Sequence, residues 1–276
     1  MRREHQVTYS HGVPTVVTML LDAADQTEPD LAGWKMTVGG SALTTALYLR
    51  ARERGMLLGT AYGMSETCPI VIKAASRPSS AAESDDALFE AFTSGLTVPL
   101  VDAQVVDEAM VPVPHDGETR GELAIRGPWL TPCYIKDVDG SNELWRGGWM
   151  HTQSVATIDA VGHVRIRDRL KDVVKTGGEW VDSIQLEELV ATAAGVIEAA
   201  VVAVPDPQWG ERPLAVIVIA SNAAPTLATI NAPVVRAIAD GLMTRYAKLA
   251  TFEILDQLPR TSVGKIDKKQ LRARFG

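Results

Sequence analysis

The pattern of apolar residues changes twice along the chain, and this constrains the fold more than any other feature of the sequence. Up to about residue 100, short apolar runs accompany one helix-like stretch, Ala42–Gly55, which predicts mixed α/β structure. From Leu96 to Arg167 the apolar runs are short and are separated by turn residues, which predicts a small antiparallel barrel or sheet. After residue 172, helix-like and strand-like segments predict a separate α+β unit.

These changes predict two domains, over residues 1–168 and 172–276, joined by a hinge at 168–172. In the middle region, strands are predicted at 103–107, 121–126, 155–158 and 163–166, with turns at Asp139-Gly140 and Gly147-Gly148. In the last region, helices are predicted over 183–193, 234–246 and 268–275, and strands over 196–204, 214–220 and 252–255.

Charge and cysteine content exclude several classes of protein. The chain has 27 Lys and Arg against 34 Asp and Glu, a net charge of −7, which argues against a dedicated nucleic-acid binder. Its 2 cysteines cannot make a disulfide framework or fill a tetrahedral zinc site. No apolar run approaches the length of a transmembrane segment. We therefore expect a cytoplasmic protein without nucleic-acid partners.

Six motifs rich in glycine, hydroxyl and charged residues follow one another along the chain. They are Gly39–Ala42, Tyr62–Thr67, Gly121–Pro128, Gly148–Thr152, Asp168–Glu179 and Pro259–Lys265. Small residues let a base or phosphate approach the backbone, and a carboxylate such as Glu66 suits Mg²⁺. Taken singly, each motif also has an ordinary structural explanation. Ser41 could cap a helix, Glu66 could lie in a capped turn, and Lys171 could belong to a solvated linker.

In this order and spacing the motifs resemble the acyl-adenylate-forming (AMP-binding) family of acyl-CoA synthetases, aryl-CoA ligases, luciferases and peptide-synthetase adenylation domains. The run Lys175–Trp180 is most similar to medium- and long-chain fatty acyl-CoA synthetases. The resemblance implies part of a large α/β domain, with a partial sheet and an antiparallel barrel, followed by a small mobile α+β domain. It also implies a ligase that converts a fatty or other carboxylic acid, ATP and CoA to acyl-CoA, AMP and pyrophosphate through an acyl-adenylate.

The resemblance implies roles for individual residues in catalysis and in binding ATP or AMP with Mg²⁺. Glu66 would hold the metal, Ser65 would contact the α-phosphate, and Lys265 would promote adenylation. The implied nucleotide-binding residues are Gly39, Gly40, Ser41, Ala42, Tyr62, Gly63, Met64, Ser154, Arg169 and Lys175. Among these, Tyr62 would stack on adenine and Arg169 would reach the ribose or a phosphate.

Further roles concern the second half-reaction and the acid. Lys171 falls at the position of the hinge about which the C-terminal domain of the family rotates. The implied CoA channel is formed by Gly177, Gly178 and Glu179, and the implied acyl pocket by His11, Gly12, Val13 and Pro14.

Two departures from the family pattern bear on ATP binding. The phosphate loop that precedes the Tyr-Gly loop in the family is missing, and the similar run Thr93–Pro99 lies downstream of Glu66 and lacks Lys-Gly. We therefore expect the chain to start midway through the large domain. Ser154 stands where the family has an Asp that binds both ribose hydroxyls, and each lost hydrogen bond to a charge costs about 1.5–3 kcal/mol. A smaller departure is Pro132–Tyr134, where a Gly more often precedes the Tyr.

Several functions remain open at this point. The chain could be a synthetase fragment that does not act alone, a non-catalytic remnant or binding module, or one subunit of a split synthetase with a separately encoded N-terminal half. The acid could be an aryl acid instead of a fatty acid. Because half a sheet cannot bury both faces, a large exposed apolar surface within residues 1–100 would indicate a missing partner.

Overall fold

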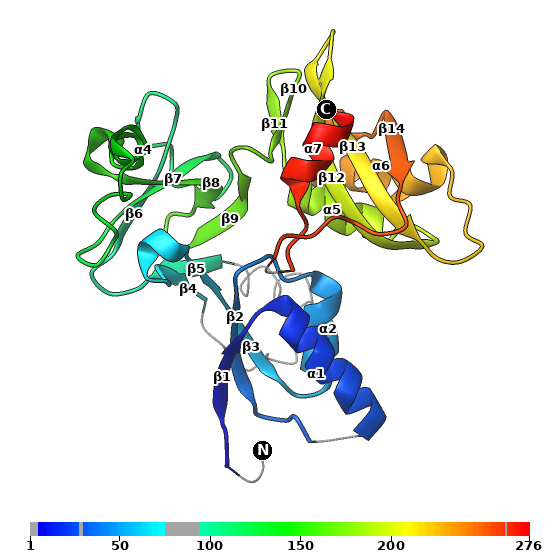
Figure 1. Ribbon diagram of the computed structural model, residues 1–276, viewed down its shortest axis with the longest axis horizontal. Helices are drawn as coiled ribbons and strands as arrows, with labels where there is room; N and C mark the ends of the chain where they lie inside the picture. Colours follow the sequence, from blue (N-terminus) through cyan, green and yellow to red (C-terminus); the bar gives the residue numbers. More distant parts are fainter. Residues whose placement is uncertain (1–4, 28–29, 75–93, 263) are drawn as a thin grey trace. The chain divides into compact units, whose positions relative to one another are not determined.

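The computed structural model describes residues 5–27, 30–74, 94–262 and 264–276, so Thr93 of the phosphate-loop-like run and Val263 of the last motif lie outside the described residues. Contacts within the chain divide it into two compact units, Met1–Ile166 and Arg167–Gly276 (Figure 1). Each unit is described by itself.

The first unit is built on one long sheet that changes from parallel to antiparallel. Among the described residues its strands follow the order β1-β2-β3-β4-β5-β9-β8-β7-β6. Their bounds are β1 Tyr9–Gly12, β2 Lys35–Gly39, β3 Leu57–Tyr62, β4 Ile72–Lys73, β5 Ser94–Thr97, β6 Asp102–Val106, β7 Gly121–Arg126, β8 Met150–Ile158 and β9 Val164–Arg169. The last residues of β9, from Arg167 on, already belong to the second unit. Strands β1, β2 and β3 are parallel, and the pairs from β3–β4 onward for which a register is defined are antiparallel. Both the α/β part and the antiparallel part of the prediction are confirmed.

Helices α1 (Pro14–Thr27) and α2 (Thr45–Glu53) pack against the parallel strands (Figure 1). Met36 and Val38 alternate on β2 and point into the same buried cluster as Leu21 of α1. The predicted helix 42–55 is shorter in the structure, because Thr44 and not Ser41 supplies the N-terminal cap, with its Oγ1 accepting from the N–H of Leu47 at 3.3 Å.

The antiparallel part surrounds its own apolar cluster, which includes Leu123, Ile125 and Met150. Strand β8 is longer than the predicted segment 155–158, because its polar residues before Val155 pair with β7 without an apolar pattern to announce them. The expected turn at Asp139-Gly140 is wrong: these residues lie in helix α4 (Val138–Leu144), since Asp137 caps this helix by accepting from the N–H of Gly140 at 2.9 Å. Gly147 and Gly148 lie in a short 3₁₀ turn, η2 (Arg146–Gly148).

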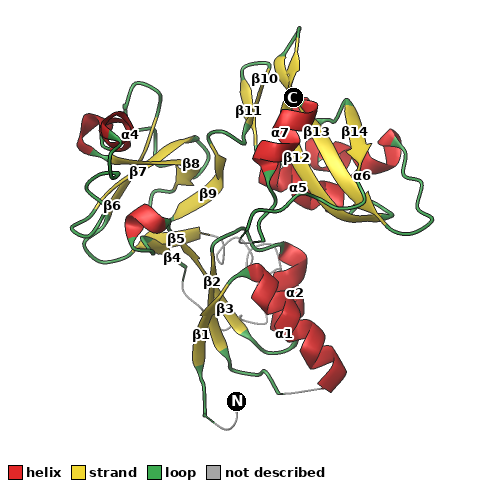
Figure 2. Cartoon of the chain, viewed as in Figure 1, coloured by secondary structure: helices red, strands yellow, loops and turns green. Residues whose placement is uncertain are grey.

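The second unit is an antiparallel sheet with helices on both faces (Figure 2). Its strands are β10 Val174–Thr176, β11 Glu179–Val181, β12 Val196–Asp206, β13 Gly210–Ile219 and β14 Thr251–Ile254, of which β14 runs parallel to β13. Its helices are α5 Ser183–Ala191, α6 Leu227–Ala239 and α7 Lys268–Phe275, with a 3₁₀ turn η3 at Arg245–Ala247. Alternation along β12 sends Val201 toward α5 and α6 and Val202 toward α7.

The predicted helix 234–246 is displaced in the structure. Helix α6 begins after Thr226, whose side chain caps it, and it continues through Pro233. It ends before Gly241, which has a φ of +73° and donates its N–H to the carbonyl of Ile238 at 3.1 Å. The left-handed glycine therefore ends the helix where the apolar pattern alone predicted its middle.

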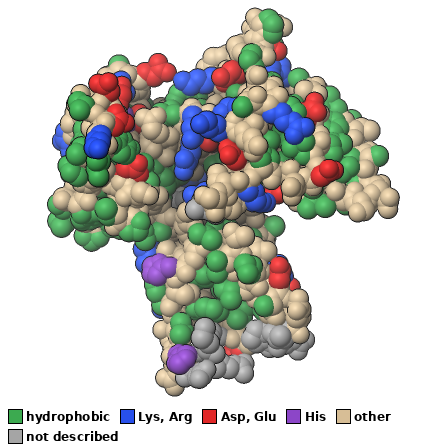
Figure 3. All heavy atoms as spheres, in the orientation of Figure 1, with side chains coloured by type: hydrophobic (Ala, Val, Ile, Leu, Met, Phe, Trp, Pro, Cys, Tyr) green, Lys and Arg blue, Asp and Glu red, His purple; other side chains and the backbone are tan. Residues whose placement is uncertain are grey.

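The surface of the chain mixes both signs of charge. On the face drawn in Figure 3, basic and acidic side chains are interspersed with apolar ones. Within the described residues, no helix is long and apolar enough to cross a membrane.

Candidate active site

The loops predicted to bind the acid and the nucleotide follow three adjacent parallel strands in the first unit. The register pairs Gly12 of β1 with Val38, and Gly39 of β2 with Ala61, next to Tyr62 at the end of β3. Parallel strands present their carboxyl ends at the same edge of a sheet, where α/β proteins commonly bind ligands. The structure therefore brings together the predicted acyl-pocket segment, the predicted adenine loop and the Tyr62 loop.

Glycines let this edge close tightly. A Cβ atom on Gly39 would lie 2.9 Å from the carbonyl oxygen of Ala61, and Gly40 has a φ of +85°. A Cβ atom on Gly63 would lie 1.5 Å from the carbonyl oxygen of Pro69, so no larger residue fits there. The predicted acyl-pocket residues His11 and Gly12 end β1, and Pro14 begins α1 after Val13.

Tyr62 and Ser154 meet although they are 92 residues apart. The hydroxyl oxygens of the two side chains lie 2.8 Å apart, and Ser154 is only 6% exposed. Ser154 Oγ therefore contacts the tyrosine predicted to stack on adenine. At this position the chain has a hydroxyl instead of the carboxylate expected from the family pattern.

Glu66 lies in the short 3₁₀ turn η1 (Ser65–Thr67), which other parts of the first unit hold in place. Thr67 is completely buried and accepts the N–H of Met64 on its Oγ1 at 2.9 Å. The backbone N–H of Thr131 donates to the carbonyl of Glu66 at 2.9 Å. The turn is therefore bonded both to its own chain segment and to one more than sixty residues later.

Tyr134 is a partner of Glu66 that sequence reasoning missed. Its hydroxyl donates to Oε1 of Glu66 at 2.8 Å. Burial, followed by the hydrogen bond and charge of Glu66, raises the pKa of Tyr134 to about 12. The phenol therefore keeps its proton and remains the donor. Its hydrogen bond orients the Glu66 carboxylate and leaves the second oxygen, Oε2, available to bind a metal ion. The only sequence signal near it was the departure at Pro132–Tyr134.

The donor set fits Mg²⁺ only in part. Among the described residues no group of three or more His, Cys, Asp or Glu side chains could hold a metal ion. Mg²⁺ is commonly bound by one or two carboxylates together with substrate phosphates and water. In the predicted role, Glu66 would supply one protein ligand, and a bound triphosphate would have to supply others.

In the second unit, Lys265 lies in a loop held by its neighbours. The N–H of Thr261 donates to the carbonyl of Lys265 at 2.8 Å, and Nη1 of Arg260 donates to the carbonyl of Gly264 at 2.9 Å. Although the Lys265 side chain is exposed, partial burial of the ammonium and then the positive charge of Arg169 lower its pKa. The structure therefore brings together Arg169 and Lys265, two residues predicted to act on the nucleotide.

The predicted hinge begins on a buried carboxylate. Asp168 is 1% exposed, and its two oxygens accept the N–H groups of Arg169 at 2.8 Å and of Ser183 at 2.6 Å. Burial raises the pKa of Asp168, and the charge of Lys268 opposes this effect. Lys171 itself is exposed in the turn that follows.

The predicted CoA-channel residues form the turn between β10 and β11. Gly177 and Gly178 have φ values of +60° and +82° there, and Glu179 begins β11. Lys175, on β10, places its Nζ 5.2 Å from the centre of the Trp180 ring. In the sequence of the second unit, this turn and the loop of Lys265 are separate segments.

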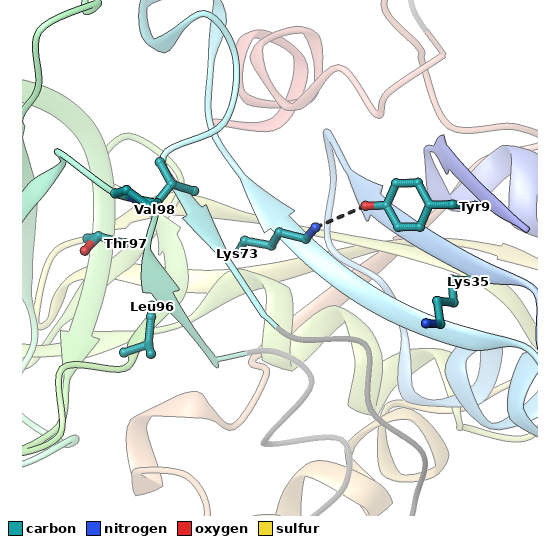
Figure 4. A pocket seen from close by; sticks show the side chains of 7 residues that line it. Tyr9, Lys35, Lys73, Leu96, Thr97 and Val98 are labelled. Carbon is teal, nitrogen blue, oxygen red and sulfur yellow. Dashed lines mark hydrogen bonds between the residues drawn. The ribbon is translucent and has the colours of Figure 1, made fainter.

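A pocket of about 460 Å³ lies elsewhere in the first unit (Figure 4). It is lined by Tyr9, Lys35, Lys73, Leu96, Thr97, Val98 and Pro99. Nζ of Lys73 donates to the hydroxyl of Tyr9 at 3.1 Å, and hydrogen bonds from Thr37 and Lys73 lower the pKa of Tyr9. None of the residues predicted for the active site lines this pocket.

Comparison with known proteins identifies the class. The family model of the AMP-binding enzymes matches residues 1–135, and that of the AMP-binding enzyme C-terminal domain matches residues 185–265. The chain belongs to the AMP-binding, adenylate-forming enzyme family, as its motifs predicted.

Individual relatives are similar along nearly the whole chain. The chain is 37% identical to a long-chain-fatty-acid–CoA ligase of Thermus thermophilus, over 98% of this chain and 49% of the relative. It is 35% identical to a 3-methylmercaptopropionyl-CoA ligase of Ruegeria lacuscaerulensis, over 98% of this chain and 49% of the relative. A solved amide bond synthetase of Marinactinospora thermotolerans superposes with a TM-score of 0.81 at 26% identity, over 100% of this chain and 54% of that one. The chain spans about half the length of the relatives it matches.

Proposed function

We propose that this chain supplies the C-terminal half of an acyl-CoA synthetase acting on a fatty acid. In the first step a carboxylate oxygen of the acid attacks the α-phosphorus of ATP and pyrophosphate leaves. In the second step the thiol of CoA attacks the acyl carbonyl and AMP leaves. The similarity to a fatty acid–CoA ligase along nearly the whole chain carries this proposal.

The residues of the first unit would bind and orient the nucleotide. Tyr62 would stack on adenine beside Ser154, and Gly39 and Gly40 would let the base approach the backbone. Glu66, with Oε1 engaged by Tyr134, would hold Mg²⁺ through its other oxygen. Mg²⁺, when bound with ATP, would neutralise charge on the phosphates.

The residues of the second unit would serve the two steps in turn. The Lys265 ammonium would stabilise the charge that develops on the carboxylate and α-phosphate oxygens during adenylation, and Arg169 would contact the ribose or a phosphate. Gly177, Gly178 and Glu179 would line the path of CoA after rotation at Lys171, with Lys175 near the nucleotide.

A second half would have to complete the enzyme. The chain spans about half the length of its relatives and lacks the phosphate loop. Val13, just before α1, and Val16 and Met19, in its first half, are spaced three residues apart and exposed, and Met19 is 67% exposed. Val13 directly follows β1, which stands at one end of the strand order among the described residues. An N-terminal half that adds to this edge would cover these side chains.

The proposal is tested by measuring pyrophosphate release from ATP in the presence of a fatty acid and CoA. The chain alone is expected to release none, and addition of an N-terminal half carrying a phosphate loop is expected to restore release. The N-terminal half alone is the control, and an aryl acid in place of the fatty acid tests the other substrate class. Robust release by the chain alone would exclude the need for a partner. No release from the mixture with either acid would favour a binding module.

A further inference from the structure

Glu122 and His151 form a buried pair between β7 and β8 that the proposed reaction does not use. Nδ1 of His151 lies 2.8 Å from Oε2 of Glu122. His151 is 2% exposed and Glu122 is 8% exposed. Ionisable side chains are rarely buried this far unless they are paired, so each of these two residues explains the burial of the other.

The hydrogen-bond partners of His151 restrict where the protons of the pair can lie. Its Nε2 lies 3.1 Å from the backbone carbonyl oxygen of Arg146, which can only accept. An ionised Glu122 can also only accept, whereas a neutral imidazole has a single N–H. Both contacts are satisfied by an imidazolium beside a carboxylate, and also by a neutral imidazole whose Nδ1 accepts from a protonated Glu122. The backbone and side-chain N–H groups of Gln153 that Oε1 accepts favour the carboxylate.

The second oxygen of Glu122 links this pair to the candidate nucleotide site. Oε1 accepts the backbone N–H of Gln153 at 2.9 Å. Gln153 has a φ of +57°, and the pairing of β7 with β8 shifts register between Glu122 and Ala124. The residue that follows this left-handed position is Ser154, whose Oγ meets the hydroxyl of Tyr62 at 2.8 Å.

We propose that Glu122 and His151 are positioning residues: a buried imidazolium–carboxylate pair holds Gln153 in its left-handed conformation and so directs Ser154 toward Tyr62. Glu122 carries the link, because one of its oxygens holds the ring and the other holds the backbone. This inference rests on the proposed function only in assigning Tyr62 and Ser154 to the nucleotide site.

The charge of the pair is tested by nitrogen NMR of the histidine rings of the full chain at neutral pH. His151 is expected to show two ring N–H groups, and only one in Glu122→Gln, whose amide oxygen can accept from Gln153 while its NH₂ faces Nδ1. The matched control is Asp159→Asn, which removes a carboxylate 3.0 Å from Nδ1 of the partly exposed His163 and leaves His151 unchanged. A single ring N–H on His151 in the unsubstituted chain would overturn the ion pair.

The positioning role is tested by amide hydrogen exchange. Glu122→Ala is expected to accelerate exchange at Gln153 by about tenfold or more, because a hydrogen bond to a charged acceptor is lost, while the amides of β12 keep their rates. If this variant does not fold, His151→Gln leaves the carboxylate but removes its cation, and a smaller acceleration at Gln153 is expected. Unchanged exchange at Gln153 in the folded variant would overturn the positioning role.

A kinetic measurement separates positioning from general stability. In the reconstituted enzyme, Glu122→Ala is expected to raise KM for ATP more than it lowers kcat, and Asp159→Asn is expected to change neither. An equal KM in Glu122→Ala and the unsubstituted protein would contradict the link to the nucleotide site. Because the NMR and exchange measurements use no nucleotide, they can fail while the ligase activity stands, and the reverse also holds.

Discussion

Glu66 in the first unit and Lys265 in the second are both predicted to act on the phosphates of ATP, but the chain holds them in opposite ways. Glu66 accepts from Tyr134, 68 residues away, and its carbonyl accepts from Thr131 of the same distant segment. The loop of Lys265 is closed by Arg260 and Thr261, within five residues, and the lysine side chain is exposed.

In the proposed two-step reaction, Glu66 and Lys265 would have to meet different requirements. A carboxylate held by distant segments cannot shift unless several tertiary hydrogen bonds break, so it suits a ligand needed in a fixed place. If the second unit rotates as proposed, a loop closed by its own neighbours would keep its shape, so its lysine would move as part of that unit.

The largest expected effect is on Lys265. In a reconstituted enzyme, Lys265→Ala should reduce fatty-acid-dependent adenylation by about 10²–10³-fold, because a charge aimed at the developing anion is lost. It should largely spare thioester formation from supplied acyl-AMP. Pyrophosphate exchange and acyl-CoA formation measure the two steps separately.

The control for this prediction is Lys269→Ala, which removes another exposed lysine from α7. It should leave both steps unchanged. If Lys265→Ala adenylates as well as Lys269→Ala does, the role assigned to Lys265 is wrong.

The next effect concerns the boundary of the second unit. A fragment over 172–276 lacks Asp168 and leaves the N–H of Ser183 without its acceptor, whereas one over 167–276 keeps it. The shorter fragment should lose about 1.5–3 kcal/mol of unfolding free energy, the value of a hydrogen bond to a buried charge. Urea unfolding of the two fragments measures the difference.

Two variants of the longer fragment sharpen this test. Asp168→Asn keeps an acceptor but loses the charge, so it should fall between the two fragments. Lys171→Ala changes an exposed side chain and should match the unsubstituted fragment. Equal stability of both fragments would show that the unit begins at the predicted boundary near residue 172.

A smaller gain is expected from Ser154→Asp. A carboxylate at this position would restore a charged ribose contact and should lower KM for ATP by about tenfold in the reconstituted enzyme. Ser154→Ala is the matched control, since it removes the oxygen that meets Tyr62 and adds no charge. A KM that does not fall in Ser154→Asp would mean that position 154 does not face the ribose.

The smallest effect is the pH dependence contributed by Tyr134. Its pKa is about 12 in the folded chain and near 10 when unfolded, so the folded state keeps the proton longer. This contribution to stability is complete below about pH 10 and is lost as the pH rises toward about 12. Unfolding free energies measured on either side of pH 10 should therefore fall more in the unsubstituted chain than in Tyr134→Phe. Equal slopes would show that Tyr134 does not contribute to the pH dependence of stability.

Local sequence patterns were sufficient for several elements. Helix α7 spans Lys268–Phe275 as predicted, because Asp267 caps it by accepting from the N–H of Gln270. Strand β7 spans Gly121–Arg126 as predicted, since it is a short apolar run between turn residues. The order of the motifs likewise predicted the family that the comparisons identify.

Where local signals conflict, the pattern misplaced elements. The apolar pattern predicts a helix from residue 234, but Thr226 caps α6 about two turns earlier. The helix then continues through Pro233. Asp139-Gly140 has the composition of a turn, yet Asp137 caps a helix there. In both places a capping side chain outside the apolar pattern decided the boundary.

The class of protein and the candidate residues could be predicted from the sequence, because its motifs resemble those of a known family. The order of its segments could be predicted from short-range apolar patterns. The tertiary structure alone decided that Ser154 meets Tyr62, that Tyr134 orients Glu66, and that the charge of Arg169 reaches Lys265. Such contacts depend on the register of strands and on the packing of segments that lie far apart in the chain. No local pattern encodes that register, since it is fixed only when distant apolar faces and hydrogen-bonding edges find each other.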